Sequence, residues 1–339
     1  MRAVWITRHG GPEVLEVRES PDPAPGAGEV RIRVRAAGLN FAEVMARLGL
    51  YPDAPKPPCV VGYEAAGVVD ALGTGVERPA VGARVLAMIR FGGHADTVVA
   101  PAAAVLEIPD GKSFEEAAAL PVNYATAWLM IFRTASVRAG ERVLVHMAAG
   151  GVGIAALQLL RTIPDTVAFG TASASKHGAL REEGCAHPID YRTRDYAEEV
   201  RALTRGEGVD VVLDPLGGKD WRIGYDLLRA GGRLVAYGFA NAARGERRSF
   251  LHVAREAFGI PRFNPLKMMG QNRGVAGFNL GHLWNRPDLL RPAMEALAAL
   301  WREGRIRPRV DSTFPLERAA DAHRRIQDRK NVGKVVLVP

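Results

Sequence analysis

The stretch best suited to chemistry is a turn of small residues, Ala148-Ala149-Gly150-Gly151-Val152-Gly153. A buried-strand pattern, Arg142 to Met147, precedes this turn, and an apolar helix pattern follows it from Ile154. Gly150 would let the backbone approach a pyrophosphate, and Gly153 would let the helix pack close to the strand. The helix N-terminus would add unpaired N–H groups and the positive end of its dipole. The order strand, turn, helix therefore predicts a dinucleotide site, although alanine replaces the usual first glycine.

The residues after the second strand indicate which dinucleotide the site takes. An NAD site usually has Asp or Glu there, about 20 residues beyond the turn, to bind the ribose 2′-OH. Here the strand pattern that begins at Val167 is followed by Thr171, Ser173 and Lys176, with no acid among them. Hydroxyls and an ammonium can receive a 2′-phosphate, and a missing carboxylate removes repulsion against it. We predict NADPH over NADH; the alternative for Lys176 is an ordinary exposed helix lysine.

Size and composition bound the class of protein. A chain of 339 residues is long enough for two domains. The 47% hydrophobic and 24% charged content is typical of a globular protein, and no apolar run reaches the length of a membrane span. The first residues carry no signal-peptide core, so we expect a cytoplasmic protein. Cys59 and Cys185 lie far apart and are expected to be buried thiols in a reducing compartment.

The formal net charge of +8 is dispersed, with local basic runs at 244–248 and 324–330. No nucleic-acid recognition module accompanies it, which favours a solvated, arginine-rich surface. The basic segment 244–267 could instead bind RNA or a membrane, but its charge run is short. We therefore do not expect nucleic acid or a membrane as a partner.

The elements that would position these residues fall into two patterns. The first 110 residues show short alternating strands, interrupted by a helix that Asn40 would cap, and resemble a barrel. From Asn123 to Asn279, helices and strands alternate, which predicts a parallel, doubly wound sheet. The predicted strands of this part are 142–147, 167–171, 187–191, 209–213, 233–239 and 275–279. We expect 241–272 to be irregular, with a helix at 289–302 and a closing strand at 335–338.

Several motifs occur in the order found in one known family. They are Ala37-Gly38-Leu39-Asn40-Phe41-Ala42-Glu43, Gly49-Leu50-Tyr51, Gly62-Tyr63-Glu64-Ala65-Ala66-Gly67-Val68-Val69, Leu120-Pro121-Val122-Asn123-Tyr124-Ala125-Thr126-Ala127, Gly277-Phe278-Asn279-Leu280-Gly281-His282-Leu283 and Asn331-Val332-Gly333-Lys334-Val335-Val336-Leu337. The chain resembles the medium-chain dehydrogenase/reductase superfamily nearly end to end. Within it, the match is to the zinc-independent quinone oxidoreductase branch, which includes zeta-crystallin and the synaptic-vesicle amine-transport-protein homologues; the segment 277–283 leans towards the latter.

The resemblance implies an α/β protein of two domains. A GroES-like β-rich catalytic domain would comprise 1–122 and 287–339, and a Rossmann domain that binds NADPH would comprise 123–286. The active site would lie in the cleft between them. Relatives commonly form dimers by joining the edge strands of their Rossmann sheets, which would place Val275 to Asn279 at a two-fold axis.

The residues at the positions of the zinc ligands exclude a zinc site. Zinc-dependent relatives use a Cys near the position of Asn40 and a His in a Gly-His-Glu motif, where this chain has Tyr63. Their structural zinc takes four closely spaced cysteines, and this chain has 2 cysteines in all. His94, His146 and His282 are expected to be structural or to line the cleft. We predict no metal, and hence an undemanding acceptor such as a quinone or enone.

The resemblance also assigns residues to the site. Asn40 and Tyr51 are the catalytic candidates: Asn40 would face the nicotinamide and substrate or act only as a helix cap, and Tyr51 would bond to or stack on a quinone unless it is a surface aromatic. Tyr191 would close over the 2′-phosphate. The predicted cofactor residues are Asn40, Val122, Thr126, Ala148, Gly150, Gly151, Val152, Gly153, Thr171, Ser173, Lys176, Tyr191, Leu216, Phe239, Phe278, Leu280 and Asn331.

The resemblance thus predicts an NADPH:quinone oxidoreductase that passes hydride from the nicotinamide to a quinone or similar conjugated carbonyl. Two alternatives stay open. One is an NADPH-dependent alkenal or enoyl reductase that acts on a carbon–carbon double bond. The other is a weakly catalytic NADPH-binding protein that associates with a membrane or RNA.

Overall fold

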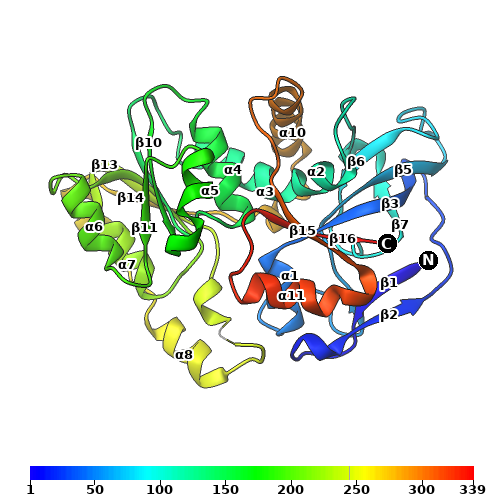
Figure 1. The fold of residues 1–339 in the computed structure, drawn as a ribbon, viewed down its shortest axis with the longest axis horizontal. Coiled ribbons are helices and arrows are strands. Elements are labelled where there is room, and N and C mark those ends of the chain that lie inside the picture. Colours follow the sequence, from blue (N-terminus) through cyan, green and yellow to red (C-terminus); the bar gives the residue numbers. More distant parts are fainter. Residues whose placement is uncertain (244) are drawn as a thin grey trace. The chain divides into compact units, whose positions relative to one another are not determined.

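The computed structural model describes residues 1–243 and 245–339, so Arg244, the first residue of the predicted basic segment, lies outside the described residues. The chain divides into two compact units (Figure 1). The first comprises Met1–Ala125, Gly245–Arg248 and Leu283–Pro339, and the second comprises Thr126–Arg244 and Ser249–His282. No domain bound was predicted around Gly245–Arg248. This short segment belongs to the first unit, where Arg248 Nη1 donates to the Gly49 carbonyl at 3.1 Å.

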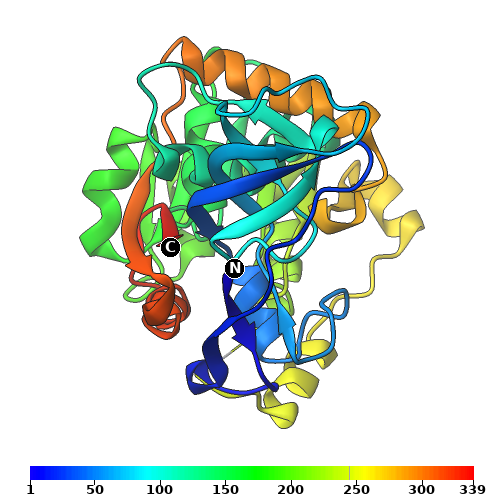
Figure 2. The ribbon, with the colours of Figure 1, turned by 90° about the vertical axis from the view of Figure 1, so that its right-hand side faces the viewer.

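The first unit is built on β-sheets (Figure 2). A three-stranded sheet has the order β2-β1-β4, and a larger sheet has the order β15-β16-β3-β5-β6-β8, with β7 paired to β3. Their bounds are β1 Arg2–Ile6, β2 Leu15–Glu19, β3 Glu29–Leu39, β4 Cys59–Val60, β5 Glu64–Leu72, β6 Arg84–Met88, β7 Thr97–Pro101, β8 Val105–Glu107, β15 Val310–Pro315 and β16 Lys334–Val338. The central strand β3 alternates buried apolar residues with arginines, as its sequence predicts.

Helices complete this unit. They are α1 Phe41–Arg47, α2 Phe114–Ala119, α10 Pro287–Arg302 and α11 Ala319–Gln327, and α3 Pro121–Trp128 begins in this unit. Asn40 caps α1, as predicted: its backbone N–H donates to Glu43 Oε2 at 2.8 Å in a capping box. The cap fixes where the chain leaves β3 and turns into the helix.

The second unit contains one six-stranded sheet in the order β11-β10-β9-β12-β13-β14, and every pair in it is parallel. The strands are β9 Arg142–Val145, β10 Val167–Ala172, β11 His187–Asp190, β12 Val209–Asp214, β13 Leu228–Ala236 and β14 Gly274–Gly277. In chain order within this unit, the arrangement is 3-2-1-4-5-6, the order of a dinucleotide-binding Rossmann sheet.

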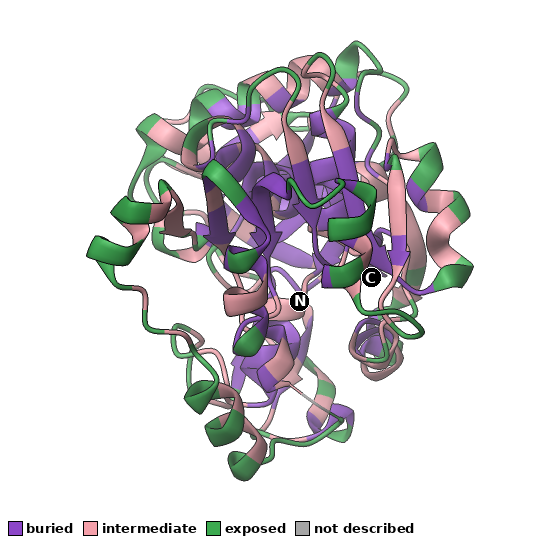
Figure 3. Cartoon of the chain, turned by 90° about the vertical axis from the view of Figure 1, so that its left-hand side faces the viewer, coloured by how far each residue is buried: buried purple, intermediate pink, exposed green. Residues whose placement is uncertain are grey.

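Helices lie on both sides of this sheet (Figure 1). They are α4 Gly151–Leu160, α5 His177–Glu182, α6 Tyr196–Leu203 and α7 Lys219–Asp226, followed by α8 Phe250–Phe258 and α9 Pro265–Gln271. Short turns of helix occur at η1 Pro12–Val14, η2 Ala102–Ala104, η3 Leu129–Thr134, η4 Ala174–Lys176, η5 Ala240–Ala242, η6 Leu280–His282 and η7 Leu316–Arg318. Buried residues gather in the strands and on the helix faces turned towards them (Figure 3).

The predicted fold class is confirmed, and the differences are local. Strand β13 begins at Leu228, before the predicted Arg233, because Leu228 pairs with Val209 ahead of the turn at Gly231. The stretch predicted to be irregular contains α8 and α9; Pro265 occupies the first turn of α9, where its missing N–H costs nothing. Strands β8 and β15 and helix α11 were not predicted.

Candidate functional site

The parallel sheet gathers the predicted cofactor residues along one edge. Because all six strands run in the same direction, their carboxyl ends share an edge, and the strand order reverses between β9 and β12. Ligands of such sheets bind outside the carboxyl ends at this reversal. The predicted residues that lie just beyond strand ends are Ala148, Gly150, Ser173, Tyr191, Leu216, Phe239 and Phe278, and Gly151, Val152 and Gly153 form the first turn of α4.

The glycine turn has the geometry that its sequence predicts. Gly150 is in extended conformation at the N-cap of α4, and the helix begins at Gly151. A Cβ on Gly153 would lie 2.5 Å from the carbonyl oxygen of Ala148, so no other residue fits there without moving the backbone. A Cβ on Gly150 would meet only the Met147 carbonyl oxygen, at 3.2 Å. Close helix–strand packing therefore depends on Gly153. Because Gly150 has no side chain, the backbone at the N-terminus of α4 is left accessible to a ligand.

The residues predicted to bind a 2′-phosphate lie around the end of β10. Thr171 is 3% exposed, and Ser173 directly follows the strand and is 7% exposed. Lys176 is half-buried and stands at the start of α5. Tyr191 is half-buried and follows the last residue of the adjacent strand β11. The Thr171 hydroxyl is engaged within the protein, because it accepts from the Met147 N–H at 3.2 Å.

Two buried titratable groups that are not among the predicted cofactor or catalytic residues also lie at strand ends along this edge. Asp214, the last residue of β12, is 0% exposed; its Oδ1 accepts the Leu216 and Gly217 N–H groups at 2.6 and 3.2 Å. Burial raises the pKa of Asp214 to about 7, although those two N–H groups oppose the shift. His146 follows β9, and burial lowers its pKa to about 4, so its ring is neutral near pH 7. A polar residue ending a buried strand is the sequence signal for both.

In the first unit, half-buried Asn40 contacts an array of three buried charged residues, Glu43, Glu64 and Lys334. The Lys334 ammonium contacts Asn40 Oδ1 and Glu64 Oε1. The Asn40 Nδ2 group donates to Glu64 Oε1 at 3.0 Å and to Glu43 Oε1 at 3.3 Å. Burial raises the pKa of Glu43 to about 7, with the nearby Lys334 charge opposing the shift. Glu64 and Lys334 lie in two of the family motifs, but nothing in the sequence indicates that their side chains are buried.

The other predicted residues of this unit divide into two groups. Val122 joins the array, since its N–H donates to Glu64 Oε2 at 2.7 Å. Asn331 instead donates from Nδ2 to the Gly333 carbonyl at 2.8 Å, within its own turn. In the second unit, Thr126 and Leu280 are each 7% exposed, and Phe278 donates its N–H to the Ala236 carbonyl.

Tyr51 stands in a group of aromatic rings centred on Tyr63. The Tyr51 and Tyr63 rings meet edge to face at 6.3 Å, and Tyr63 stacks on Trp284 at 6.4 Å with an interplanar angle of 16°. Phe91 lies 5.3 Å from Tyr63. These rings form an apolar wall that could contact a flat, conjugated molecule.

The side chains of the described residues do not form a metal site. Among residues 1–243 and 245–339, no group of three or more His, Cys, Asp and Glu side chains is placed to hold a metal ion. His94 is fully buried with its Nε2 3.2 Å from the Gly38 carbonyl, and burial lowers its pKa to about 4. His282 is exposed. Both cysteines are buried free thiols, and burial raises the pKa of Cys185 to about 12.

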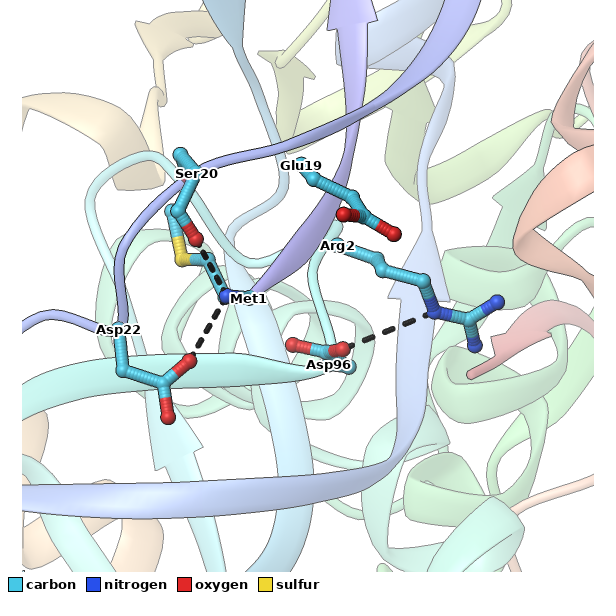
Figure 4. A pocket seen from close by; sticks show the side chains of 6 residues that line it. All are labelled: Met1, Arg2, Glu19, Ser20, Asp22 and Asp96. Carbon is cyan, nitrogen blue, oxygen red and sulfur yellow. Dashed lines mark hydrogen bonds and ion pairs between the residues drawn. The ribbon is translucent and has the colours of Figure 1, made fainter.

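A hollow at the N-terminus offers no reacting group. It is lined by Met1, Arg2, Glu19, Ser20, Asp22 and Asp96 (Figure 4). The Met1 ammonium pairs with Asp22 at 2.7 Å, and Arg2 lies 3.7 Å from Asp96. Its charges therefore compensate one another on the surface of the first unit.

Comparison with known proteins agrees with this architecture. Residues 26–110 match the family described as alcohol dehydrogenase GroES-like domain, and residues 184–337 match the family described as zinc-binding dehydrogenase. A Danio rerio protein named synaptic vesicle membrane protein VAT-1 homolog is 47% identical over 99% of this chain and 69% of that protein.

Solved structures give the same result. A human synaptic vesicle membrane protein VAT-1 homolog-like protein superposes with a TM-score of 0.87 at 39% identity, covering 100% of this chain and 98% of that chain. Escherichia coli quinone oxidoreductase complexed with NADPH has a TM-score of 0.88 at 28% identity over 100% of both chains. CurK enoyl reductase has a TM-score of 0.84 at 31% identity, covering 99% of this chain and 98% of that chain.

The fold and its relatives define a two-unit oxidoreductase with a GroES-like β-rich unit and a Rossmann sheet. The chain belongs to the medium-chain dehydrogenase/reductase superfamily, as the sequence motifs predict. Within this superfamily it is close to the VAT-1 homologues, and its structural neighbours include quinone oxidoreductases.

Proposed function

We propose that this chain is an NADPH-dependent, zinc-independent reductase of quinones or similar conjugated carbonyls. The observation that carries the proposal is the Rossmann sheet with a tight glycine turn at its strand-order reversal and Lys176, rather than an acid, beyond the second strand. The Escherichia coli neighbour, solved with NADPH, supports the same choice.

The residues present fit NADPH. The backbone at Gly150 and the N-terminus of α4 would hold the pyrophosphate, and Ser173, Lys176 and Tyr191 would surround the 2′-phosphate. The bound cofactor would supply the hydride. Residues 1–243 and 245–339 place no metal-binding group to polarise a simple ketone. A conjugated acceptor suits such a site, because hydride addition gives a delocalised anion that water can protonate.

The reaction class can be tested by following the absorbance of the reduced nicotinamide. NADPH and NADH are each offered with 1,4-benzoquinone, 9,10-phenanthrenequinone and an alkenal. Rapid turnover of a quinone with NADPH alone supports the proposal. Turnover of the alkenal but of neither quinone would favour a reductase of carbon–carbon double bonds. The similarity to CurK enoyl reductase supports this alternative. Tight NADPH binding with no turnover would contradict both.

A second candidate function concerns the surface of α8 and α9. We expected no membrane partner, but six of the eight exposed large apolar side chains among the described residues lie here: Phe250, Leu251, Phe258, Ile260, Leu266 and Met269. No residue from 249 to 271 is buried (Figure 3). Arg255, Arg262 and Lys267 lie among them. Apolar side chains interleaved with cations suit the surface of an anionic membrane.

This candidate concerns a protein lying on a membrane, since within the described residues no helix is long and apolar enough to cross one. The test is co-sedimentation with phosphatidylserine vesicles and with neutral phosphatidylcholine vesicles. The double variant Leu251→Ser/Phe258→Ser should release the protein from the anionic vesicles. Val81→Ser/Leu203→Ser, which removes exposed apolar side chains elsewhere, should not. Equal sedimentation of all three proteins would refute the membrane role.

We also propose a homodimer joined at β14. This strand ends the sheet, and its outer edge pairs with no other described strand. An open edge of a parallel sheet can pair with the same edge of a second copy. Light scattering that gives the mass of a monomer at all concentrations would refute this arrangement.

A further inference from the structure

Three neighbouring strands bring Lys334, Asn40 and Glu64 together in the first unit. In the order β16-β3-β5, Val335 pairs with Leu39, and Ala65 pairs with Ala37. Asn40 directly follows the end of β3, and Lys334 and Glu64 begin their own strands. Strand register therefore places an ammonium, a carboxamide and a carboxylate at one point, although they are far apart in the sequence.

The charged members of this cluster are closed to water, whereas Asn40 is half-buried. The Lys334 side chain is 2% exposed, and the Glu64 and Glu43 side chains are 0% exposed. A Cβ on Gly38 would lie 2.5 Å from Glu64 Oε1 and 2.6 Å from Lys334 Cε, so the glycine makes room for the pair. A buried charge is retained only where partners compensate it. Each group here has such a partner.

The chemistry of these groups leaves Asn40 one orientation. An ammonium has hydrogens to donate and no lone pair, so the Asn40 atom facing Lys334 must be the carbonyl oxygen. The Asn40 NH₂ group then points to two carboxylates, donating to Glu64 at 3.0 Å and to Glu43 at 3.3 Å. Both amide hydrogens are thereby committed. Asn40 keeps only the second lone pair of its oxygen for a ligand, and acts towards it as an acceptor.

We propose that Lys334 is a positioning residue of the reductase site, which locks the Asn40 carboxamide with its oxygen as the ligand-facing acceptor. This rests on the proposed function, in which Asn40 faces the nicotinamide. Here the local cation is the ammonium of Lys334, which also compensates Glu64, and Glu64 in turn accepts the N–H of Val122 at 2.7 Å.

The test compares Lys334→Met with the control variant Lys330→Met. Lys330 is an exposed lysine shortly before β16, and it pairs with Asp328. Lys334→Met should lower kcat at least tenfold, change the dissociation constant of NADPH less than threefold, and have no further effect in an Asn40→Ala background. Lys330→Met should leave kcat unchanged. An equal loss of kcat from Lys334→Met with and without Asn40 would overturn the proposal.

A charge-neutral pair guards against a variant that fails to fold. In Lys334→Met/Glu64→Gln, neither buried charge is left without its partner, so the fold should persist. If Lys334 only neutralises Glu64, this double variant recovers wild-type kcat, and the proposal fails. If Lys334 orients Asn40, kcat stays low in a folded protein.

A readout independent of turnover separates this inference from the proposed function. In protein labelled with ¹⁵N-asparagine, the two Asn40 side-chain amide protons should exchange slowly with solvent, because both are donated in hydrogen bonds to the buried carboxylates of Glu43 and Glu64. Lys334→Met should speed that exchange at least tenfold. Unchanged exchange refutes the positioning role, whereas wild-type protein that reduces no quinone or enone refutes the proposed function alone.

Discussion

The backbone N–H of Met147 donates to the hydroxyl of Thr171 at 3.2 Å, and so ties the glycine turn after β9 to the end of β10. Met147 has a φ of 51°, in the left-handed region that side chains other than glycine rarely adopt. The next N–H, of Ala148, donates to the Thr171 carbonyl at 3.1 Å. Thr171 thus holds the strained entry to the turn through both its hydroxyl and its backbone.

Replacing this hydroxyl tests its role. Thr171→Val keeps the shape of the side chain but leaves the N–H of half-buried Met147 without its acceptor, which should cost about 1 kcal/mol of unfolding free energy. NADPH should bind several-fold more weakly, as measured by fluorescence titration, because the turn loses its fixed conformation. Thr171→Ser retains the hydroxyl and is the control. A valine variant that binds NADPH like the wild type would contradict this account.

Gly153→Ala should impair the same turn by a steric route. The added Cβ would lie 2.5 Å from the Ala148 carbonyl oxygen, so α4 must move away from β9. Overpacking of this kind costs about 1–3 kcal/mol, which chemical denaturation would measure. Gly178→Ala is the matched control, because a Cβ there has nothing within 4 Å and the residue lies on exposed α5. Equal stability of the two variants would argue against tight packing at Gly153.

Reversing the charge of Lys176 should change the choice of cofactor. Lys176→Glu places a carboxylate where the 2′-phosphate of NADPH would lie, so the KM for NADPH should rise at least tenfold while that for NADH changes little. Arg181→Glu is the control for the charge change, because Arg181 is exposed on the same helix. The same rise in KM for both dinucleotides would remove Lys176 from the 2′-phosphate site.

Glu43 should make stability fall as pH rises. Burial raises its pKa from 4.5 to about 7, so across that window the folded state holds a proton that the unfolded state has released. The groups around its carboxylate are half-buried Asn40 and the buried residues Glu64, Lys334 and His94, whose Nε2 lies 3.9 Å away. As the pH rises from 4.5 to about 7, the free energy of unfolding of Glu43→Gln should therefore increase relative to that of the wild type, by up to about 3 kcal/mol.

Urea denaturation at a series of pH values measures this difference. The glutamine can still accept the N–H of Asn40, so the cap of α1 is preserved. Parallel stability curves for the two proteins would show that Glu43 ionises as readily in the folded state as in the unfolded chain.

The sequence alone determined the features that depend on local pattern. Alternation of strands and helices from Asn123 to Asn279 predicts the doubly wound sheet, because strand and helix periods differ and parallel strands need crossovers. The turn from Ala148 to Gly153 and the Asn40 cap are also local, since each is made by residues a few positions apart. These features, and the family that the motifs indicate, are confirmed.

Features that depend on residues distant in the sequence are visible only in the three-dimensional fold. Lys334 and Glu64 are two charged residues in strand-like segments until β16 and β5 flank β3 and exclude water from both. Strand β15 carries polar residues and was missed, because its place beside β16 comes from pairing rather than from a clear alternation. Likewise, the helical pattern of α8 and α9 is ordinary and does not indicate that their apolar side chains are exposed. Burial, charge compensation and exposure are set by what the fold places next to a residue, and a one-dimensional pattern does not contain that information.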